Sequence, residues 1–260
     1  MSDTAVLLKV SEAGVATLSL NRPTLHNAFD DLMIAQLQTI LDIIHNDSQI
    51  NVVVLTATGT SFSAGADLNW MRRMAAYSYE ENIDDALALA KLMQTLKYLR
   101  QPTIASVQGA AFGGGVGLVA CCDIAIASEV ATFCLSEVKI GLMPAVISPF
   151  VIAAIGERAA RYYCLTAERM SAAKAVQLGL VTQVVKAEQL DACVENVVQK
   201  LLGNNASAVI ATKALLNRVS KDPYDKQHRQ LNAEAIASIR VSAEGQAGLT
   251  AFLEKQKRLK

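Results

Sequence analysis

Three consecutive glycines, Gly113–Gly115, stand between two apolar segments that carry no charge. This pattern predicts a buried strand that turns directly into a helix. Glycine lets a ligand approach the backbone closely, and the free N–H groups at a helix N-terminus favour negative charge. The segment could therefore bind an anion or a polarised carbonyl oxygen. A tight turn with close helix packing explains the same glycines about equally well.

The known glycine-rich phosphate cradles do not match this segment. Leu118 stands where G-x-G-x-x-G, counted from Gly113, requires its last glycine, and no Gly-Lys-Ser/Thr follows. The pattern thus points away from a nucleotide phosphate held in either cradle, and a polarised carbonyl oxygen is the alternative.

A second run of small residues, 61–67, follows the apolar segment Val52–Leu55 and leads into another predicted helix. The backbone N–H of Ala66 is therefore a second candidate donor. Ser63 lacks the G-x-S-x-G context of a nucleophile, so we do not assign it that role. Asp67 is most simply interpreted as a helix cap.

Glu137 is the titratable residue with the most suggestive surroundings, since apolar residues flank Ser136-Glu137. A carboxylate in such surroundings could have a raised pKa suited to proton transfer near neutral pH. The competing interpretation is a first-turn glutamate that interacts with a helix dipole.

The apolar pattern along the chain predicts the elements that position these residues. We expect a hairpin from Ala5–Val10 and Val15–Leu20, followed by strands and helices in alternation and by a mainly helical region after about Pro149. The result is an α/β protein with a parallel-sheet core and a helical C-terminal extension. The further strands are expected at Val52–Leu55, Thr103–Val107 and Ile124–Ala127, and the helices at 30–44, 83–96, 191–202, 206–219, 226–240 and 243–253.

The composition narrows the functional class. The chain has 260 residues, 52% hydrophobic, with a formal net charge of +0, which argues against nucleic-acid binding. The five cysteines include no C-x-x-C, so neither a disulfide framework nor a zinc site is expected, and no metal, flavin or nicotinamide site is evident. The charge-free segment 101–122 is long enough to span a membrane, but its proline and glycines favour a soluble core. We expect a cytoplasmic protein.

Together these motifs resemble the crotonase (enoyl-CoA hydratase/isomerase) superfamily over nearly the whole chain. The matching runs are 21–28, 63–67, 109–115, 122–124 and 136–137. The resemblance implies a ClpP-like fold of repeated ββα units over residues 1–200, which would contain the coenzyme A site. It also implies a helical oligomerisation region over residues 201–260 that assembles homotrimers or hexamers (dimers of trimers).

The resemblance further implies roles for single residues. Ala66 and Gly114 match the two oxyanion-hole positions, and Glu137 matches a catalytic glutamate. No separate cofactor is implied, because coenzyme A arrives as part of the acyl-CoA substrate. The residues implied to bind its coenzyme A portion are Arg22, the loop Ala64, Gly65, Ala66, Asp67 and Leu68, and Phe252 and Lys255, which would reach a neighbouring subunit's coenzyme A.

One departure from the family pattern bears on the reaction. Ordinary hydratases of the family use two glutamates, and the first of them falls at Gly117, which has no side chain. A family isomerase needs only the glutamate that matches Glu137. The missing glutamate therefore leaves three alternative functions: a Δ3–Δ2 enoyl-CoA isomerase, a decarboxylase that uses Glu137, and an acyl-CoA-binding protein without turnover.

A closer resemblance favours hydration instead. The runs 63–74, 116–123 and 135–149 are similar to the bacterial methylglutaconyl-CoA hydratase and gamma-carboxygeranoyl-CoA hydratase group. This similarity implies a lyase that adds water to a branched, carboxylated 2-enoyl-CoA in leucine or isoprenoid catabolism.

Overall fold

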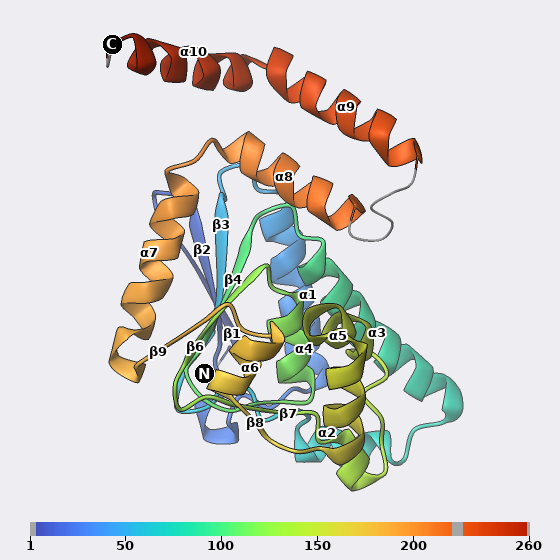
Figure 1. The fold of residues 1–260 in the computed structure, drawn as a ribbon. Coiled ribbons are helices and arrows are strands. Elements are labelled where there is room, and N and C mark those ends of the chain that lie inside the picture. Colours follow the sequence, from blue (N-terminus) through green and yellow to red (C-terminus); the bar gives the residue numbers. More distant parts are fainter. Residues whose placement is uncertain (1–3, 220–225, 259–260) are drawn as a thin grey trace.

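The computed structural model describes the backbone of residues 4–219 and 226–258, and their side chains except those of 226–229, 252 and 255–258. A six-stranded sheet forms the centre, in the order β1-β2-β3-β4-β6-β9, and a smaller sheet has the order β5-β7-β8 (Figure 1). The strands are β1 Val6–Val10, β2 Val15–Leu20, β3 Val52–Ala57, β4 Thr103–Val107, β5 Ala111–Phe112, β6 Ile124–Ser128, β7 Thr132–Cys134, β8 Met170–Ser171 and β9 Gln183–Val185.

The predicted hairpin and parallel sheet are both confirmed. Strands β1 and β2 pair antiparallel around a turn at Gly14, and β2, β3, β4, β6 and β9 follow one another in parallel. Gly14 has a φ of +77°, and a Cβ there would lie 2.3 Å from the carbonyl oxygen of Gln49. The turn therefore requires glycine.

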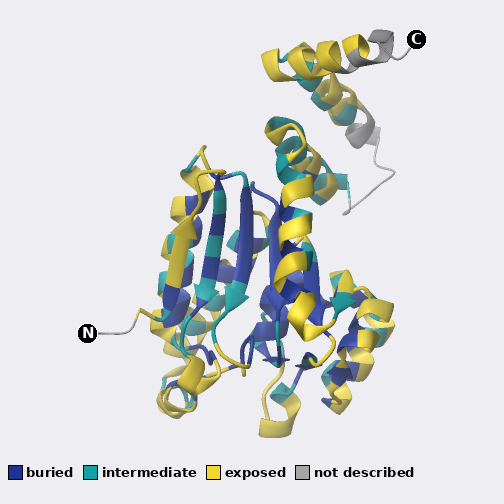
Figure 2. Ribbon diagram, turned by 90° about the vertical axis from the view of Figure 1, so that its left-hand side faces the viewer, coloured by how far each residue is buried: buried dark blue, intermediate teal, exposed yellow. Residues whose placement is uncertain are grey.

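Helices cover both faces of the large sheet, which explains why its central strands are apolar on both sides. On one face, Val53 and Leu55 of β3 join the core formed with α1, α3, α4 and α5. On the other, Val52 and Val54 pack against α7. Figure 2 shows the buried strands between these layers. The helices are α1 Asp31–Asn46, α2 Leu68–Met74, α3 Tyr79–Lys97, α4 Gly114–Cys121, α5 Ser148–Thr166, α6 Ala172–Leu178 and α7 Leu190–Leu202.

Two features of the elements were not expected from the sequence. The region after Pro149 is mainly helical, as expected, but it also contributes β8 and β9 to the two sheets. These strands have two and three residues, which is too short to show a period in the sequence. In α3, Ile83 and Leu87 are exposed although they share the apolar spacing of the buried Met93, since the first half of the helix extends past the core.

The C-terminal helices are α8 Ala206–Val219, α9 Lys226–Val241 and α10 Ala243–Arg258. Helix α8 is fastened to the core by Lys213, whose Nζ lies 2.6 Å from Oδ2 of Asp123. Helices α9 and α10 pack on each other beyond α8 (Figure 1). Several of their apolar side chains are exposed, namely Leu231, Ile236, Val241, Leu249 and Leu253. Such a surface suits an oligomer, and both the division at residue 200 and the trimer or hexamer remain predictions.

The sequence predicts neither disulfides nor a zinc site, and it favours a soluble core rather than a membrane segment. Cys121, Cys122 and Cys134 are buried, Cys164 and Cys193 are half-buried, and all five are free thiols. Over the described residues, no group of His, Cys, Asp or Glu side chains could hold a metal ion. Within the same residues, none of the helices has the length and apolar character that crossing a membrane requires.

Candidate active site

The turn before α4 presents a free backbone donor. Gly113 adopts a φ of +50° and fixes the turn by donating its N–H to the carbonyl oxygen of Cys134 at 2.9 Å. Helix α4 begins at Gly114, whose N–H has no acceptor in the part of the chain that the structure describes. A Cβ on Gly114 would lie 2.9 Å from the ring of Phe29, so this position has no room for a side chain.

The second donor comes from the loop that follows β3. The carbonyl oxygen of Gly65 accepts the N–H of Phe29 at 2.7 Å. In a trans peptide the N–H points opposite to the C=O, so the N–H of Ala66 faces away from Phe29. On that side lies β5, which pairs with the same loop through Ser63 and Ala111. The Ala66 N–H is thereby directed to the side of β5 and α4.

Glu137 lies beside these two turns, at the start of the 3₁₀ helix η2, Glu137–Ile140. Its Oε1 is 3.2 Å from the position that a Cβ on Gly113 would occupy. Its Oε2 is buried without a hydrogen-bond partner among the described residues. Burial raises the pKa of the Glu137 carboxyl above its ordinary value, although a hydrogen bond to its own backbone opposes the shift. A carboxylate in this state is suited to exchanging protons with a ligand.

The space next to Gly117 is filled by other side chains. A Cβ on Gly117 would lie 2.4 Å from Cγ2 of Ile147 and 3.2 Å from Cε of Met93. Ile147 and Met93 are both buried. No second carboxylate therefore stands at the position where the family resemblance places its first glutamate.

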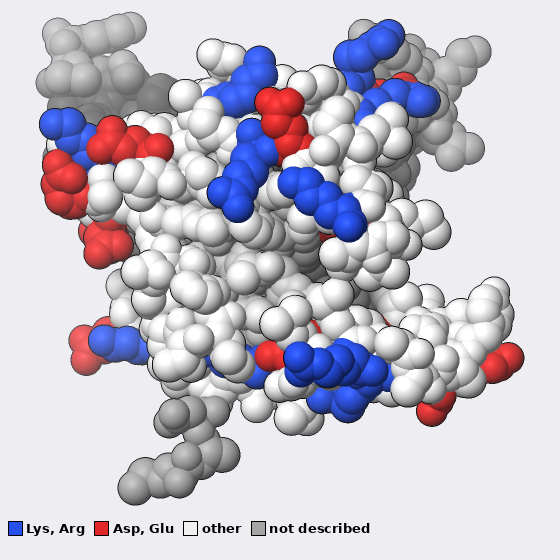
Figure 3. Space-filling model, turned by 90° about the horizontal axis from the view of Figure 1, so that it is seen from below, with Lys and Arg blue, Asp and Glu red and all other residues white. Residues whose placement is uncertain are grey.

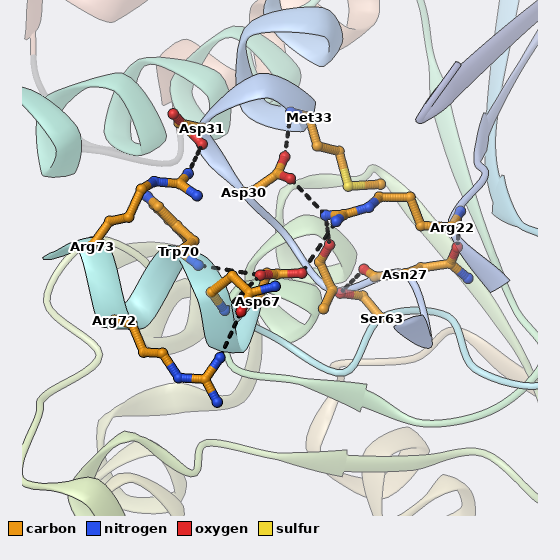
Figure 4. Close-up of polar contacts among 12 residues, drawn as sticks. Arg22, Asn27, Asp30, Asp31, Met33, Ser63, Asp67, Trp70, Arg72 and Arg73 are labelled. Carbon is orange, nitrogen blue, oxygen red and sulfur yellow. Dashed lines mark hydrogen bonds and ion pairs between the residues drawn. The ribbon is translucent and has the colours of Figure 1, made fainter. Parts of the chain in front are cut away.

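The loop Ala64–Leu68 is positioned by Arg22 and Asp67 (Figure 4). The guanidinium of Arg22 contacts Oδ2 of Asp30 at 2.9 Å and Oδ2 of Asp67 at 3.1 Å, and it donates to the carbonyl oxygen of Ala28 at 2.9 Å. Arg22 is thus largely turned into the protein and paired with two carboxylates. Its expected role beside coenzyme A phosphates stays a prediction.

Asp67 is the N-cap of α2, as its place in the sequence predicted. Its Oδ1 accepts the N–H groups of Asn69 at 2.8 Å and Trp70 at 3.1 Å. Burial alone would raise the pKa of Asp67, but these two N–H groups and the Arg22 guanidinium outweigh it, so the net pKa is lowered. Asp67 is therefore a charged anchor for the loop that contains Ala66.

Two residues without a predicted role also hold this loop. Ser63 donates its Oγ–H to the carbonyl oxygen of Asn27 at 2.8 Å, which is a structural bond. The buried Asn27, at a φ of +54°, donates its side-chain amide to the carbonyl oxygens of Thr58 and Ser61. Its position in the run 21–28 was a sequence signal, but only the fold shows which carbonyl groups it bonds.

The surface on the side of α2 is hollowed in the middle, with Lys and Arg side chains on either side of the hollow (Figure 3). Such a surface suits a ligand that carries negative charge. The side chains of Phe252 and Lys255, which were predicted to reach a neighbouring subunit, lie outside the described residues.

Comparison with known proteins finds relatives that are similar to this chain over nearly its whole length. A short-chain-enoyl-CoA hydratase of Clostridium acetobutylicum is 31% identical over 95% of this chain and 94% of its own. A trans-2-decenoyl-[acyl-carrier-protein] isomerase of Streptococcus mutans is 28% identical over 94% and 93%. The crystal structure of an enoyl-CoA hydratase from Shewanella pealeana superposes with a TM-score of 0.93, at 46% identity over 98% of this chain and 95% of that one.

These similarities confirm the crotonase fold that the sequence motifs implied. The family model described as enoyl-CoA hydratase/isomerase matches residues 10–259, which is nearly the whole chain. The chain therefore belongs to the enoyl-CoA hydratase/isomerase family.

Proposed function

We propose that this protein is a hydratase that adds water to a branched, carboxylated 2-enoyl-CoA similar to 3-methylglutaconyl-CoA. The observation that carries the proposal is the placement of Glu137. Its buried, partly unpaired carboxylate lies against Gly113, directly before the free N–H of Gly114. Relatives named as enoyl-CoA hydratases support hydration in general.

The reaction begins with the thioester. The N–H groups of Ala66 and Gly114 donate to its carbonyl oxygen, which polarises the conjugated double bond. Donors that are fixed before the reaction stabilise the enolate oxygen more strongly than water does, and one such donor contributes roughly 3 kcal/mol.

Glu137 then takes a proton from water and passes the same proton to Cα. As the oxygen of water bonds to Cβ, the ionised carboxylate of Glu137 takes a proton from that water, and the double-bond electrons move to the thioester oxygen. The protonated Glu137 next delivers the proton to Cα, the enolate reverts to the thioester, and the carboxylate is restored. A raised pKa serves both steps, because the group must accept and release a proton near neutral pH.

The substrate class rests on the finer resemblance. The runs 63–74, 116–123 and 135–149 support a substrate that is branched at Cβ and carries a second carboxylate. A reaction of this kind would belong to leucine or isoprenoid breakdown in the cytoplasm, in a homotrimer or hexamer completed by α9 and α10.

The second candidate is a Δ3–Δ2 enoyl-CoA isomerase, favoured by the single carboxylate at the site and by the isomerase among the relatives. A decarboxylase would use the same enolate.

Mass spectrometry of products from 3-methylglutaconyl-CoA, crotonyl-CoA and a 3-enoyl-CoA separates these reactions. The proposal predicts a gain of one water on the branched diacid. A shifted double bond in the 3-enoyl thioester without that gain would establish the isomerase, and loss of carbon dioxide the decarboxylase. Tight acyl-CoA binding without any product would indicate a binding protein.

A further inference from the structure

Gly117 lies one turn into α4, on the helix whose first residue offers the Gly114 N–H. Residues three positions apart lie on the same face of a helix, and one turn advances 5.4 Å along its axis. An acyl chain whose carbonyl oxygen is held at Gly114 has its β-carbon three bonds from that oxygen. The reacting carbons therefore lie within reach of the side chains that surround Gly117.

Those side chains are apolar and fixed. Ile147 and Met93 are 2% and 0% exposed, and both lie within 3.2 Å of the position that a Cβ on Gly117 would occupy. Ile147 immediately precedes α5, where its carbonyl oxygen accepts the N–H of Val151 at 3.1 Å. Met93 lies in the buried half of α3, with its sulfur 3.9 Å from that of Cys121. Helix α3 and the start of α5, which both pack on α4, thus hold the pair beside Gly117.

We propose that Ile147, supported by Met93, is a specificity-determining residue of this site. It closes the Gly117 side with an apolar wall that contacts the substituent on the β-carbon, so that this substituent is a small alkyl group. The inference rests on the proposed function for the identity of the ligand as an acyl thioester, and it names the part of the substrate that the wall selects.

The wall has two consequences for the reaction. An ionised group on that side would be desolvated among Ile147 and Met93 without a partner, which is costly, so a carboxylated arm of the substrate must lie elsewhere. A methyl group suits this wall, because removing apolar surface from water against apolar side chains is favourable. Where the family pattern places a carboxylate, this chain has the side chain of Ile147 beside a glycine, and in this proposal that side chain contacts a hydrocarbon branch of the substrate.

The first test is binding selectivity, measured by calorimetry with the saturated, unreactive thioesters 3-methylglutaryl-CoA and 3-ethylglutaryl-CoA. The wild-type protein should bind the methyl compound more tightly. Ile147→Ala should shift the ratio of the two Kd values toward the ethyl compound by on the order of tenfold, which is typical for one methylene in an apolar pocket. Ile50→Ala is the matched control, since Ile50 is equally buried (1% exposed) and lies in the loop before β3. An unchanged ratio in Ile147→Ala, or the same shift in Ile50→Ala, would overturn the proposal.

The second test needs no ligand and therefore stands apart from the proposed function. Gly117→Ala should lower the Tm, because its Cβ meets Ile147, and this loss should largely disappear in the Ile147→Ala background. If the decrease in Tm of the double variant equals the sum of the decreases in the two single variants, Ile147 does not fill this space. If the wild-type protein yields no water adduct while both tests succeed, hydration is refuted and the apolar wall stands.

Discussion

The carboxylate of Glu137 lies against the backbone of Gly113, with its Oε1 3.2 Å from the point where a Cβ on Gly113 would stand. This contact places the only carboxylate assigned to proton transfer next to the turn that exposes the Gly114 N–H. The absence of a side chain at Gly113 thus sets the distance between the proposed acid–base group, Glu137, and the proposed oxyanion donor, the N–H of Gly114.

Substitution of this glycine should separate the two groups. Gly113→Ala puts a methyl group against Glu137 and strains a backbone with a φ of +50°. We expect kcat to fall on the order of 100-fold, since displacements of about 1 Å have effects of this size. Gly156→Ala is the control, because Gly156 also has a positive φ, of +76°, but a Cβ there meets no atom within 4 Å. A similar loss of kcat in both variants would assign the effect to backbone strain alone.

The raised pKa of Glu137 makes a prediction about stability and pH. Between the ordinary pKa of glutamate and the raised pKa of Glu137, the folded state binds more protons than the unfolded state, so stability falls as the pH rises through this window. Glu137→Gln removes the buried charge. Its Tm should exceed that of the wild-type protein at roughly pH 8, and this advantage should shrink toward roughly pH 4. Thermal unfolding across this range provides the measurement, and a variant that is less stable at every pH would refute the burial argument.

Arg22 should prove important to the loop that carries Ala66. Its removal leaves Asp30 and Asp67 without their common cation, so Arg22→Ala should lower the free energy of unfolding by about 3 kcal/mol. Arg22→Lys should recover only part of this loss, because an ammonium group lacks the planar fork of the guanidinium. Urea unfolding measures both. Arg73→Ala removes a half-exposed ion pair with Asp31, which water screens, and should cost much less than Arg22→Ala. Equal losses at Arg22 and Arg73 would contradict this account.

The attachment of α8 depends on an ion pair between a buried lysine and a partly exposed aspartate. Lys213 contacts Asp123 at 2.6 Å and donates to the carbonyl oxygen of Gln101 at 2.8 Å. Lys213→Ala leaves the partly exposed Asp123 without this cation and the carbonyl oxygen of Gln101 without its donor, and it should cost about 1–3 kcal/mol. The double variant Asp123→Asn, Lys213→Met should cost less, because neither charge then remains. Chemical denaturation of the three proteins forms the test, and a double variant worse than Lys213→Ala alone would show that the pair stabilises in another way.

Most of the fold could be predicted from the sequence because its strands and helices have clear apolar periods. Strands β3 and β4 were indicated as buried strands of a parallel sheet by their continuous apolar runs, which reflect burial on both faces. Strands β8 and β9 could not be predicted, since two or three residues show no period. The exposure of Ile83 and Leu87 depends on where α3 leaves the core, and that is decided by the tertiary packing.

The candidate site was predictable where backbone chemistry leaves a sequence signal. Glycines at Gly113–Gly115 and the cap at Asp67 marked two helix starts before the fold was known. Ile147 lies in the run 135–149, but nothing in the sequence singled it out for the site, because its meaning comes from a contact with Gly117, thirty positions earlier in the chain. The inward pairing of Arg22 was likewise invisible, since an arginine in a loop gives no sign of which carboxylates it meets.

The most direct test of the proposed function is turnover of 3-methylglutaconyl-CoA by the wild-type protein and by Glu137→Gln, with hydrated product quantified by mass spectrometry. The account predicts water addition by the wild-type protein and a kcat about 10²- to 10⁴-fold lower in the variant, because glutamine cannot transfer the proton. Binding of an unreactive acyl-CoA by both proteins would show that the site is intact. Near-full turnover by Glu137→Gln would contradict the assignment of Glu137 as the acid–base group.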